Sequence, residues 1–100
     1  MQYRRHFHQG ASYFLTVNLA ERSSDLLIEN IDVLRYAFKT VKQKHPFHID
    51  AIVILPDHIH MLCTMPIDDA NYSERLKLIK YDFSYRIAKT ELNRPDFIGE

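Results

Sequence analysis

The chain has 100 residues, 46% hydrophobic and 12% aromatic, which suits one small folded domain with a single core. Its 13 basic and 13 acidic residues balance, which argues mildly against general nucleic-acid binding but leaves local basic clusters open. A lone cysteine, Cys63, excludes an internal disulfide and a cysteine-based zinc motif, and the lack of a long apolar run predicts a cytoplasmic protein with no membrane partner.

Residues 12–20, SYFLTVNLA, alternate in polarity and are rich in β-forming residues, which predicts a strand. The segment ERSSD that follows ends this strand. Its two predicted faces are Tyr13, Leu15, Val17 and Leu19 on one side, and Phe14, Thr16 and Asn18 on the other.

A helical period replaces the alternation over residues 29–44. Its apolar stripe consists of Ile31, Leu34, Phe38 and Val41. Pro46 lacks a backbone N–H and ends the helix.

Two further strands are predicted after the helix. Residues 47–55, FHIDAIVIL, form an apolar run typical of a central strand, and Pro56 and Asp57 provide a tight turn. Residues 58–65 predict the third strand. Its faces are Ile59, Met61, Cys63 and Met65 on one side, and His58, His60, Leu62 and Thr64 on the other.

A second helix is expected after the loop PIDDANYS, with Asn71 or Ser73 as its cap and its end near Glu91. One apolar stripe, the predicted core face, contains Tyr72, Leu76, Ile79, Phe83 and Ile87. A second stripe, on nearly the opposite side, contains Leu78, Tyr81, Tyr85 and Leu92. An exposed second stripe predicts a homo-oligomer with Tyr81 and Tyr85, or the first strand, at the contact. Alternatively, Phe97 and Ile98 of the tail fold back over it.

The order strand, helix, strand, strand, helix predicts an α+β fold, the opening of a ferredoxin-like βαββα(β) domain with an antiparallel sheet and two helices. Its last strand is not found in the sequence, and residues 1–100 are expected to form a single domain. The first and third strands are neighbours in this topology. Thr16 and Asn18 are therefore expected beside His58 and His60, although the sequence leaves the register open.

The motif His58-Ile59-His60 places two imidazoles on one face of a strand. Imidazole is the commonest metal ligand among side chains, and an added oxygen ligand suits Mg²⁺ or Mn²⁺, which polarise a phosphate. Asp57, Thr16 and Asn18 are the local candidates for polar support. Two ligands make zinc a poor candidate, and the alternative is that the pair only solvates an exposed sheet face.

The segment AIVILPDHIHMLCTMP, residues 51–66, resembles the histidine hairpin of the HUH single-tyrosine transposases, in which two histidines flank a hydrophobic residue. The segments YRRHFHQGASYFLTVNLAERSSDLLIENIDVLRYAF and SERLKLIKYDFSYRI resemble the flanking parts of the branch of REP-associated tyrosine transposases. The resemblance covers residues 3–88 and is carried by the hairpin together with YFLTVNL.

The resemblance implies an enzyme that cleaves and rejoins single-stranded DNA at hairpins. A tyrosine attacks the phosphate to give a 5′-phosphotyrosine, with a divalent metal, Mg²⁺ or Mn²⁺, held by His58 and His60. Single-stranded or hairpin DNA is then the partner, and Arg4, Arg5 and His6 are the expected DNA-binding residues.

One departure from the family limits this expectation. The family's tyrosine lies in a segment like Tyr-Ile-x-x-Asn-Pro on a later helix, which this chain lacks, and Tyr81 and Tyr85 do not match it. We therefore expect only the N-terminal portion of the domain, without its nucleophile and inactive in cleavage. Two alternatives stay open: a catalytically silent module that binds hairpin or single-stranded DNA, and an unrelated ferredoxin-like domain with structural histidines.

Overall fold

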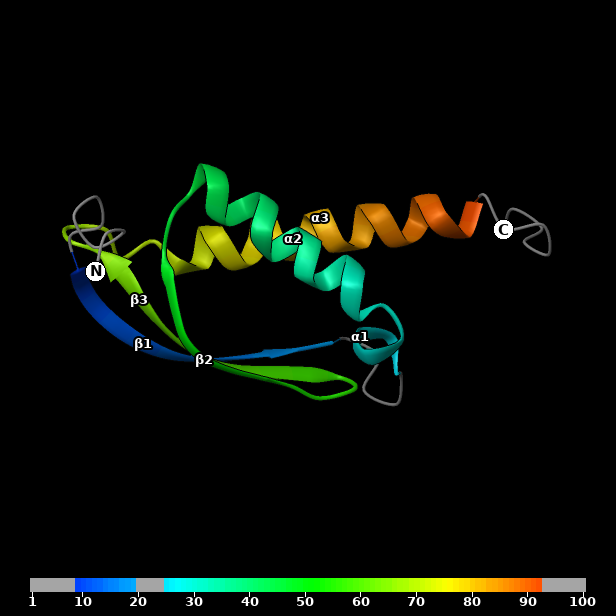
Figure 1. Cartoon of the computed structure of the whole chain (residues 1–100), viewed down its shortest axis with the longest axis horizontal. Coiled ribbons are helices and arrows are strands. Elements are labelled where there is room, and N and C mark those ends of the chain that lie inside the picture. The colour runs from blue at the N-terminus through cyan, green and yellow to red at the C-terminus, as the bar shows by residue number, and fades with distance from the viewer. Residues whose placement is uncertain (1–8, 20–24, 93–100) are drawn as a thin grey trace.

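The computed structural model describes residues 9–19 and 25–92, with side chains described as far as Lys89. This part of the chain contains three strands and three helices. The order matches the predicted one apart from a short extra helix (Figure 1). The elements are β1 (Gln9–Asn18), α1 (Leu26–Glu29), α2 (Ile31–Lys44), β2 (His48–Ile54), β3 (His58–Pro66) and α3 (Tyr72–Leu92).

The strands form one antiparallel sheet in the order β1-β3-β2. The α+β class and the predicted pairing of the first and third strands are therefore confirmed, and the described residues contain no fourth strand. The prediction that residues 47–55 form a central strand is wrong. The tight turn at Pro56 and Asp57 folds β2 back on one side of β3, and β1 takes the other side, so that β3 is central and β2 is an edge.

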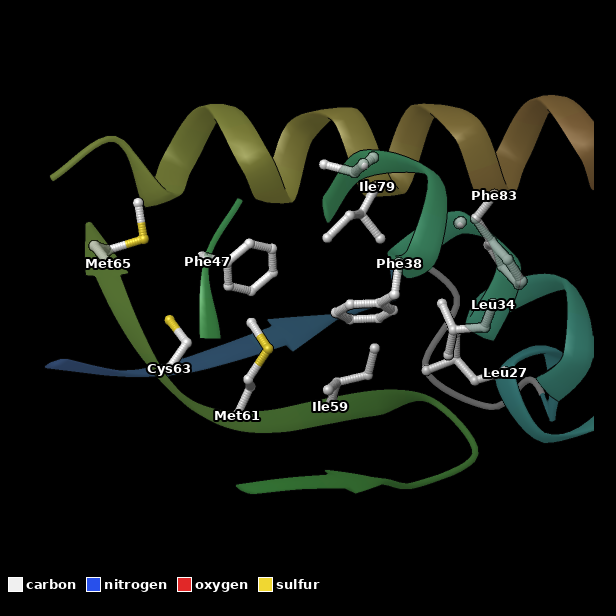
Figure 2. Close-up of a cluster of buried hydrophobic side chains, with 12 residues drawn as sticks. Leu27, Leu34, Phe38, Phe47, Ile59, Met61, Cys63, Met65, Ile79 and Phe83 are labelled. Atoms are coloured by element: carbon white, nitrogen blue, oxygen red, sulfur yellow. The ribbon is translucent and has the colours of Figure 1, made fainter. Parts of the chain in front are cut away.

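Helices α2 and α3 cover one face of the sheet (Figure 1), and the core lies between the two layers. Figure 2 shows the side chains of alternate β3 residues pointing toward the helices. Those residues are Ile59, Met61, Cys63 and Met65, all buried as predicted. Burial raises the pKa of the Cys63 thiol, which makes it a poor nucleophile.

The predicted stripe of the first helix is confirmed, because Leu34, Phe38 and Val41 are buried and Ile31 packs against them. The predicted start is not, because the chain breaks at Asn30 into α1 and α2. The backbone N–H and the side-chain amide of Asn30 both donate to the carbonyl oxygen of Leu26, at 3.1 and 3.0 Å. These hydrogen bonds end α1. A new helix, α2, begins with the hydrogen bond from Leu34 N–H to the carbonyl oxygen of Asn30.

Helix α3 begins as predicted at Asn71, whose Oδ1 accepts a hydrogen bond from Glu74 N–H at 3.2 Å. Ile79 and Phe83 of its core stripe are buried. The second stripe is exposed at Tyr81 and Tyr85, as predicted, but Leu78 packs at the border of the core. The side chain of Leu92 and the predicted plug, Phe97 and Ile98, lie outside the described residues.

Arg75 fastens the start of α3 to the turn between α2 and β2. Its buried guanidinium donates to the carbonyl oxygens of His45 and Pro46 at 3.1 and 2.9 Å, and to both oxygens of Asp69 at 3.3 and 3.0 Å. The hydrogen bond from Arg75, helped by one from the Asn71 backbone, holds the pKa of Asp69 below its usual value.

Among the described helices, none is both long and apolar enough to cross a membrane.

Candidate metal and DNA-binding site

The sheet face away from the helices carries the histidine pair. The turn before β3 is closed by a hydrogen bond of 2.8 Å from Leu55 N–H to the backbone carbonyl oxygen of His58. Leu19 N–H donates to the backbone carbonyl oxygen of Asp57 at 2.9 Å. Since Ile59 and Met61 point into the core, alternation turns His58 and His60 to the opposite face. Their ring centroids lie 4.8 Å apart, with the ring planes at 83°.

The register between β1 and β3 completes the site. Thr16 lies directly opposite His60, and Asn18 directly opposite His58, as the topology predicted. The hydroxyl oxygen of Thr16 is 3.1 Å from Nδ1 of His60. Thr16 and Asn18 are exposed, so the site is open to solvent on the β1 side.

Asp57 holds the other histidine. Its Oδ1 is 2.8 Å from Nδ1 of His58, and the two side chains are only 19% and 23% exposed. A carboxylate can only accept, so the Nδ1–H of His58 donates and, in the neutral ring, Nε2 keeps its lone pair. The Thr16 hydroxyl can donate or accept, and when it accepts from the Nδ1–H of His60, Nε2 of that ring also keeps its lone pair. Both Nε2 atoms are then available to a ligand, the arrangement typical of histidines that bind metals.

This donor set fits a divalent ion that keeps further positions for water or phosphate oxygen. The described residues contain no group of three or more His, Cys, Asp or Glu side chains able to hold a metal. A metal held here would take two imidazole nitrogens from the protein, and Asn18, opposite His58 in the register, is a candidate for a further oxygen ligand. An all-protein tetrahedral zinc site does not fit.

Sequence reasoning missed the role of Phe14 on this face. Its ring is 69% exposed and lies parallel to the ring of His60, with centroids 5.9 Å apart and an interplanar angle of 11°. The signal was present in the alternation, which placed a phenylalanine on the polar face with Thr16 and Asn18.

A hydrogen-bonded chain of polar side chains, also missed, crosses the same face at its other end. Thr64, expected on this face, is nevertheless buried; it donates to Asp50 at 2.6 Å, and the hydroxyl of Ser12 lies 2.9 Å from its oxygen. His48 Nε2 lies 3.5 Å from the other oxygen of Asp50. Asp50 reaches Thr64 because the β2–β3 register shifts between Ile49 and Ala51, and no pattern in the sequence marks that shift.

The predicted DNA-binding residues and the tyrosines need separate treatment. Arg4, Arg5 and His6 lie outside the described residues. Tyr81 and Tyr85 lie on α3, on the helical side of the sheet (Figure 1). The remaining described tyrosines are also on that side: Tyr36 and Tyr72 on helices, and Tyr13 facing the core.

Comparison with known proteins finds relatives of this chain. No protein-family model matches the chain. A REP-associated tyrosine transposase of Escherichia coli (strain K12) is 38% identical over 96 residues, which are 96% of this chain and 58% of that protein. A protein of the same family name from Haemophilus influenzae is 40% identical over 87 residues, 87% of this chain and 49% of that protein.

A solved structure shows the same fold. The structure of a REP-associated tyrosine transposase bound to a REP hairpin superposes with a TM-score of 0.77 and 40% sequence identity, covering 88% of this chain and 53% of that one. The chain thus spans about half the length of the relatives that it matches. Over most of its length, the chain is therefore similar in both sequence and fold to REP-associated tyrosine transposases.

Proposed function

We propose that the chain forms the metal-binding and DNA-binding part of a transposase domain that processes single-stranded DNA at a hairpin. The observation that carries this proposal is the pair His58 and His60 on the open sheet face, each with Nδ1 engaged by a neighbouring oxygen. A similar protein has been solved bound to a REP hairpin, which supports hairpin DNA as the partner. DNA as a substrate agrees with the cytoplasmic location expected from the sequence.

Each residue has a defined task in this proposal. His58 and His60 hold Mg²⁺ or Mn²⁺ through Nε2, and the bound ion neutralises charge on the oxygens of a DNA phosphate. Asp57 and Thr16 orient the two rings. Asn18, opposite His58, is placed to offer an oxygen to the ion or a hydrogen bond to the phosphate.

The attacking tyrosine must come from outside the described residues. Every described tyrosine lies on the helical side of the sheet or faces the core, so the sheet separates it from the histidine pair. The described part therefore binds the phosphate and the metal but supplies no nucleophile. We expect no covalent adduct with DNA from Tyr81 or Tyr85.

A binding assay in two metal conditions tests the proposal. Electrophoretic mobility shift with a hairpin that carries a single-stranded flank should show binding that strengthens with Mn²⁺. The double variant His58→Ala/His60→Ala should lose the Mn²⁺-dependent part. His45→Ala serves as the control, because this exposed histidine at the end of α2 lies on the helical side.

Three results would count against the proposal. If Mn²⁺ has no effect on the wild-type chain, or if the double variant responds to it equally, the pair is not a metal site. If hairpin DNA does not bind in either condition, the alternative of an unrelated domain with structural histidines gains support. Labelled DNA that stays on the protein after boiling in detergent would show that one of the chain's own tyrosines attacks.

A further inference from the structure

An exposed aromatic ring lies next to the histidine pair. Phe14 on β1 leaves 69% of its surface to solvent, although it sits in the middle of a ten-residue strand. One of its neighbours on the same side along β1 is Thr16, which contacts His60. Leaving a phenylalanine exposed on a sheet forfeits the free energy that its burial would contribute, and an exposed apolar group beside a polar site often marks a binding surface.

The register shows that this ring is part of a larger exposed apolar surface. Phe14 pairs directly with Leu62, which is 39% exposed, and His60 pairs with Val53, which is 54% exposed. The rings of Phe14 and His60 are nearly parallel, at 11°. Phe14, His60, Leu62 and Val53 therefore form one patch, the Phe14 platform, with an aromatic centre and aliphatic neighbours.

The size and border of the platform indicate its occupant. A stable interface between two proteins takes about 20–30 residues from each side, whereas the platform has four side chains. Polar residues border it along the sheet: Thr16 and Asn18 toward the turn, and Ser12 and Thr64 at the other end. A planar, largely apolar ligand with polar edges fits such a surface, and an unpaired nucleobase has that character.

We infer that Phe14 is a stacking platform for one unpaired base of the DNA strand, next to the phosphate that the histidine pair takes. The inference rests on the proposed function, since the histidine site would place the strand on this face. Stacking on an aromatic ring tolerates every base, so the platform would recognise a single-stranded flank without reading its sequence. Inside a duplex, each base is stacked on its neighbours on both faces, so these paired bases would not use the platform.

Abasic-site scanning tests this directly. Affinities are measured for a blunt hairpin, for a hairpin with a single-stranded flank, and for flanked hairpins that lack the base at one position at a time. Phe14→Ala should weaken binding of the flanked hairpin about tenfold and leave the blunt hairpin unchanged. At one flank position, removing the base should weaken binding by the wild type about as much as Phe14→Ala weakens binding of the complete flank. With the base at that position removed, Phe14→Ala should cause no further loss of affinity.

Two further variants act as controls. Phe14→Trp keeps a ring and should retain the affinity for the flanked hairpin. Ile67→Ala removes a comparably exposed apolar side chain, 58% exposed and in the turn after β3, and should change neither affinity. Phe14 contributes little to the core, so these variants should fold.

Each outcome is decisive. Unchanged affinity in Phe14→Ala for the flanked hairpin, while the wild type binds it, overturns the platform and leaves the proposed function standing. Equal weakening on blunt and flanked hairpins overturns stacking on an unpaired base. A change in sedimentation without a change in DNA affinity would show that the patch contacts protein and also overturns the inference. Failure of the wild type to bind either hairpin overturns the proposed function itself.

Discussion

The hydroxyl oxygen of Thr16 on β1 lies 3.1 Å from Nδ1 of His60 on β3, directly across the antiparallel ladder. This contact orients the ring, and when the hydroxyl accepts from Nδ1–H, it leaves Nε2 for a ligand. A residue 44 positions away in the sequence thus decides how the histidine is presented.

The first prediction follows from that contact. Thr16→Val keeps the shape of the side chain but removes the hydroxyl, so the orientation of His60 is no longer fixed. Loss of such a supporting hydrogen bond typically costs about tenfold to a hundredfold in metal affinity. Calorimetric titration with Mn²⁺ should show this weakening, whereas Thr16→Ser, which keeps the hydroxyl, should bind like the wild type. Equal binding by all three proteins would show that Thr16 does not support a metal ligand.

A second prediction concerns Gly10, at the irregular start of β1. A Cβ atom at this position would lie 2.5 Å from the carbonyl oxygen of Pro66 and 3.0 Å from Cα of Ile67, both backbone atoms. The paired strands must therefore separate to accept Gly10→Ala. We expect a loss of about 1–3 kcal/mol in the free energy of unfolding, measured by urea denaturation. Ala11→Ser at the exposed neighbouring position should change it by less than about 0.5 kcal/mol, and an equally stable Gly10→Ala would mean that the strands do not approach so closely.

The sequence predicted much of the architecture because alternation and helical periodicity record burial on one face. The faces of β1 and β3 and the core stripes of α2 and α3 were predicted for this reason. The position of β2 was not, because an apolar run fits an edge or a central strand equally well, and pairing decides between them. The break at Asn30 depends on a side-chain hydrogen bond to Leu26 that no period records.

The candidate site likewise has features that the sequence predicted and features that it did not. The topology alone brought Thr16 and Asn18 beside the histidines, since adjacent strands share a face. The contact of Asp57 with His58 and the parallel rings of Phe14 and His60 depend on side-chain rotamers and exact register, which composition does not specify.

A third prediction concerns Arg75, which is 6% exposed. Arg75→Met fills similar space but leaves the carbonyl oxygens of His45 and Pro46 without their donor. Losing these bonds should lower the free energy of unfolding by about 2 kcal/mol. Arg35→Met is the matched control, because the Arg35 side chain is 75% exposed and its contact with Asp32 is a long ion pair of 4.0 Å. Losing such an exposed pair should change the free energy of unfolding little. Equal stability of the two variants would show that Arg75 does not fasten the turn.

The fourth prediction is a pH dependence that belongs to Asp69. Its pKa is lowered from the ordinary 3.8 in the folded chain, chiefly by the hydrogen bond from Arg75. A group with a lowered folded pKa stabilises the fold above its unfolded pKa, and this stabilisation is lost as the pH falls through the folded pKa. Urea midpoints measured from neutral pH down to about pH 2 should therefore fall less steeply below about pH 4 in Asp69→Asn than in the wild type.

The control for this pH dependence is the adjacent residue. Asp68 has a φ of 63°, in the left-handed region that asparagine also adopts readily, so Asp68→Asn should leave the backbone unchanged. The urea midpoints of Asp68→Asn should fall at low pH as steeply as those of the wild type. An Asp69→Asn profile parallel to both would show that the contact with Arg75 contributes nothing to acid sensitivity.

The last prediction concerns self-association. Tyr81 and Tyr85 are 71% and 58% exposed on neighbouring turns of α3, and β1 pairs only with β3 among the described strands. We expect a dimer or larger assembly that covers the two tyrosines or extends the sheet at β1. Tyr81→Glu places a charge in the first contact and should yield monomers in sedimentation equilibrium at high micromolar concentration. A dimer that persists in Tyr81→Glu would instead place the contact at β1. A wild-type chain that is monomeric under these conditions would contradict self-association on either surface.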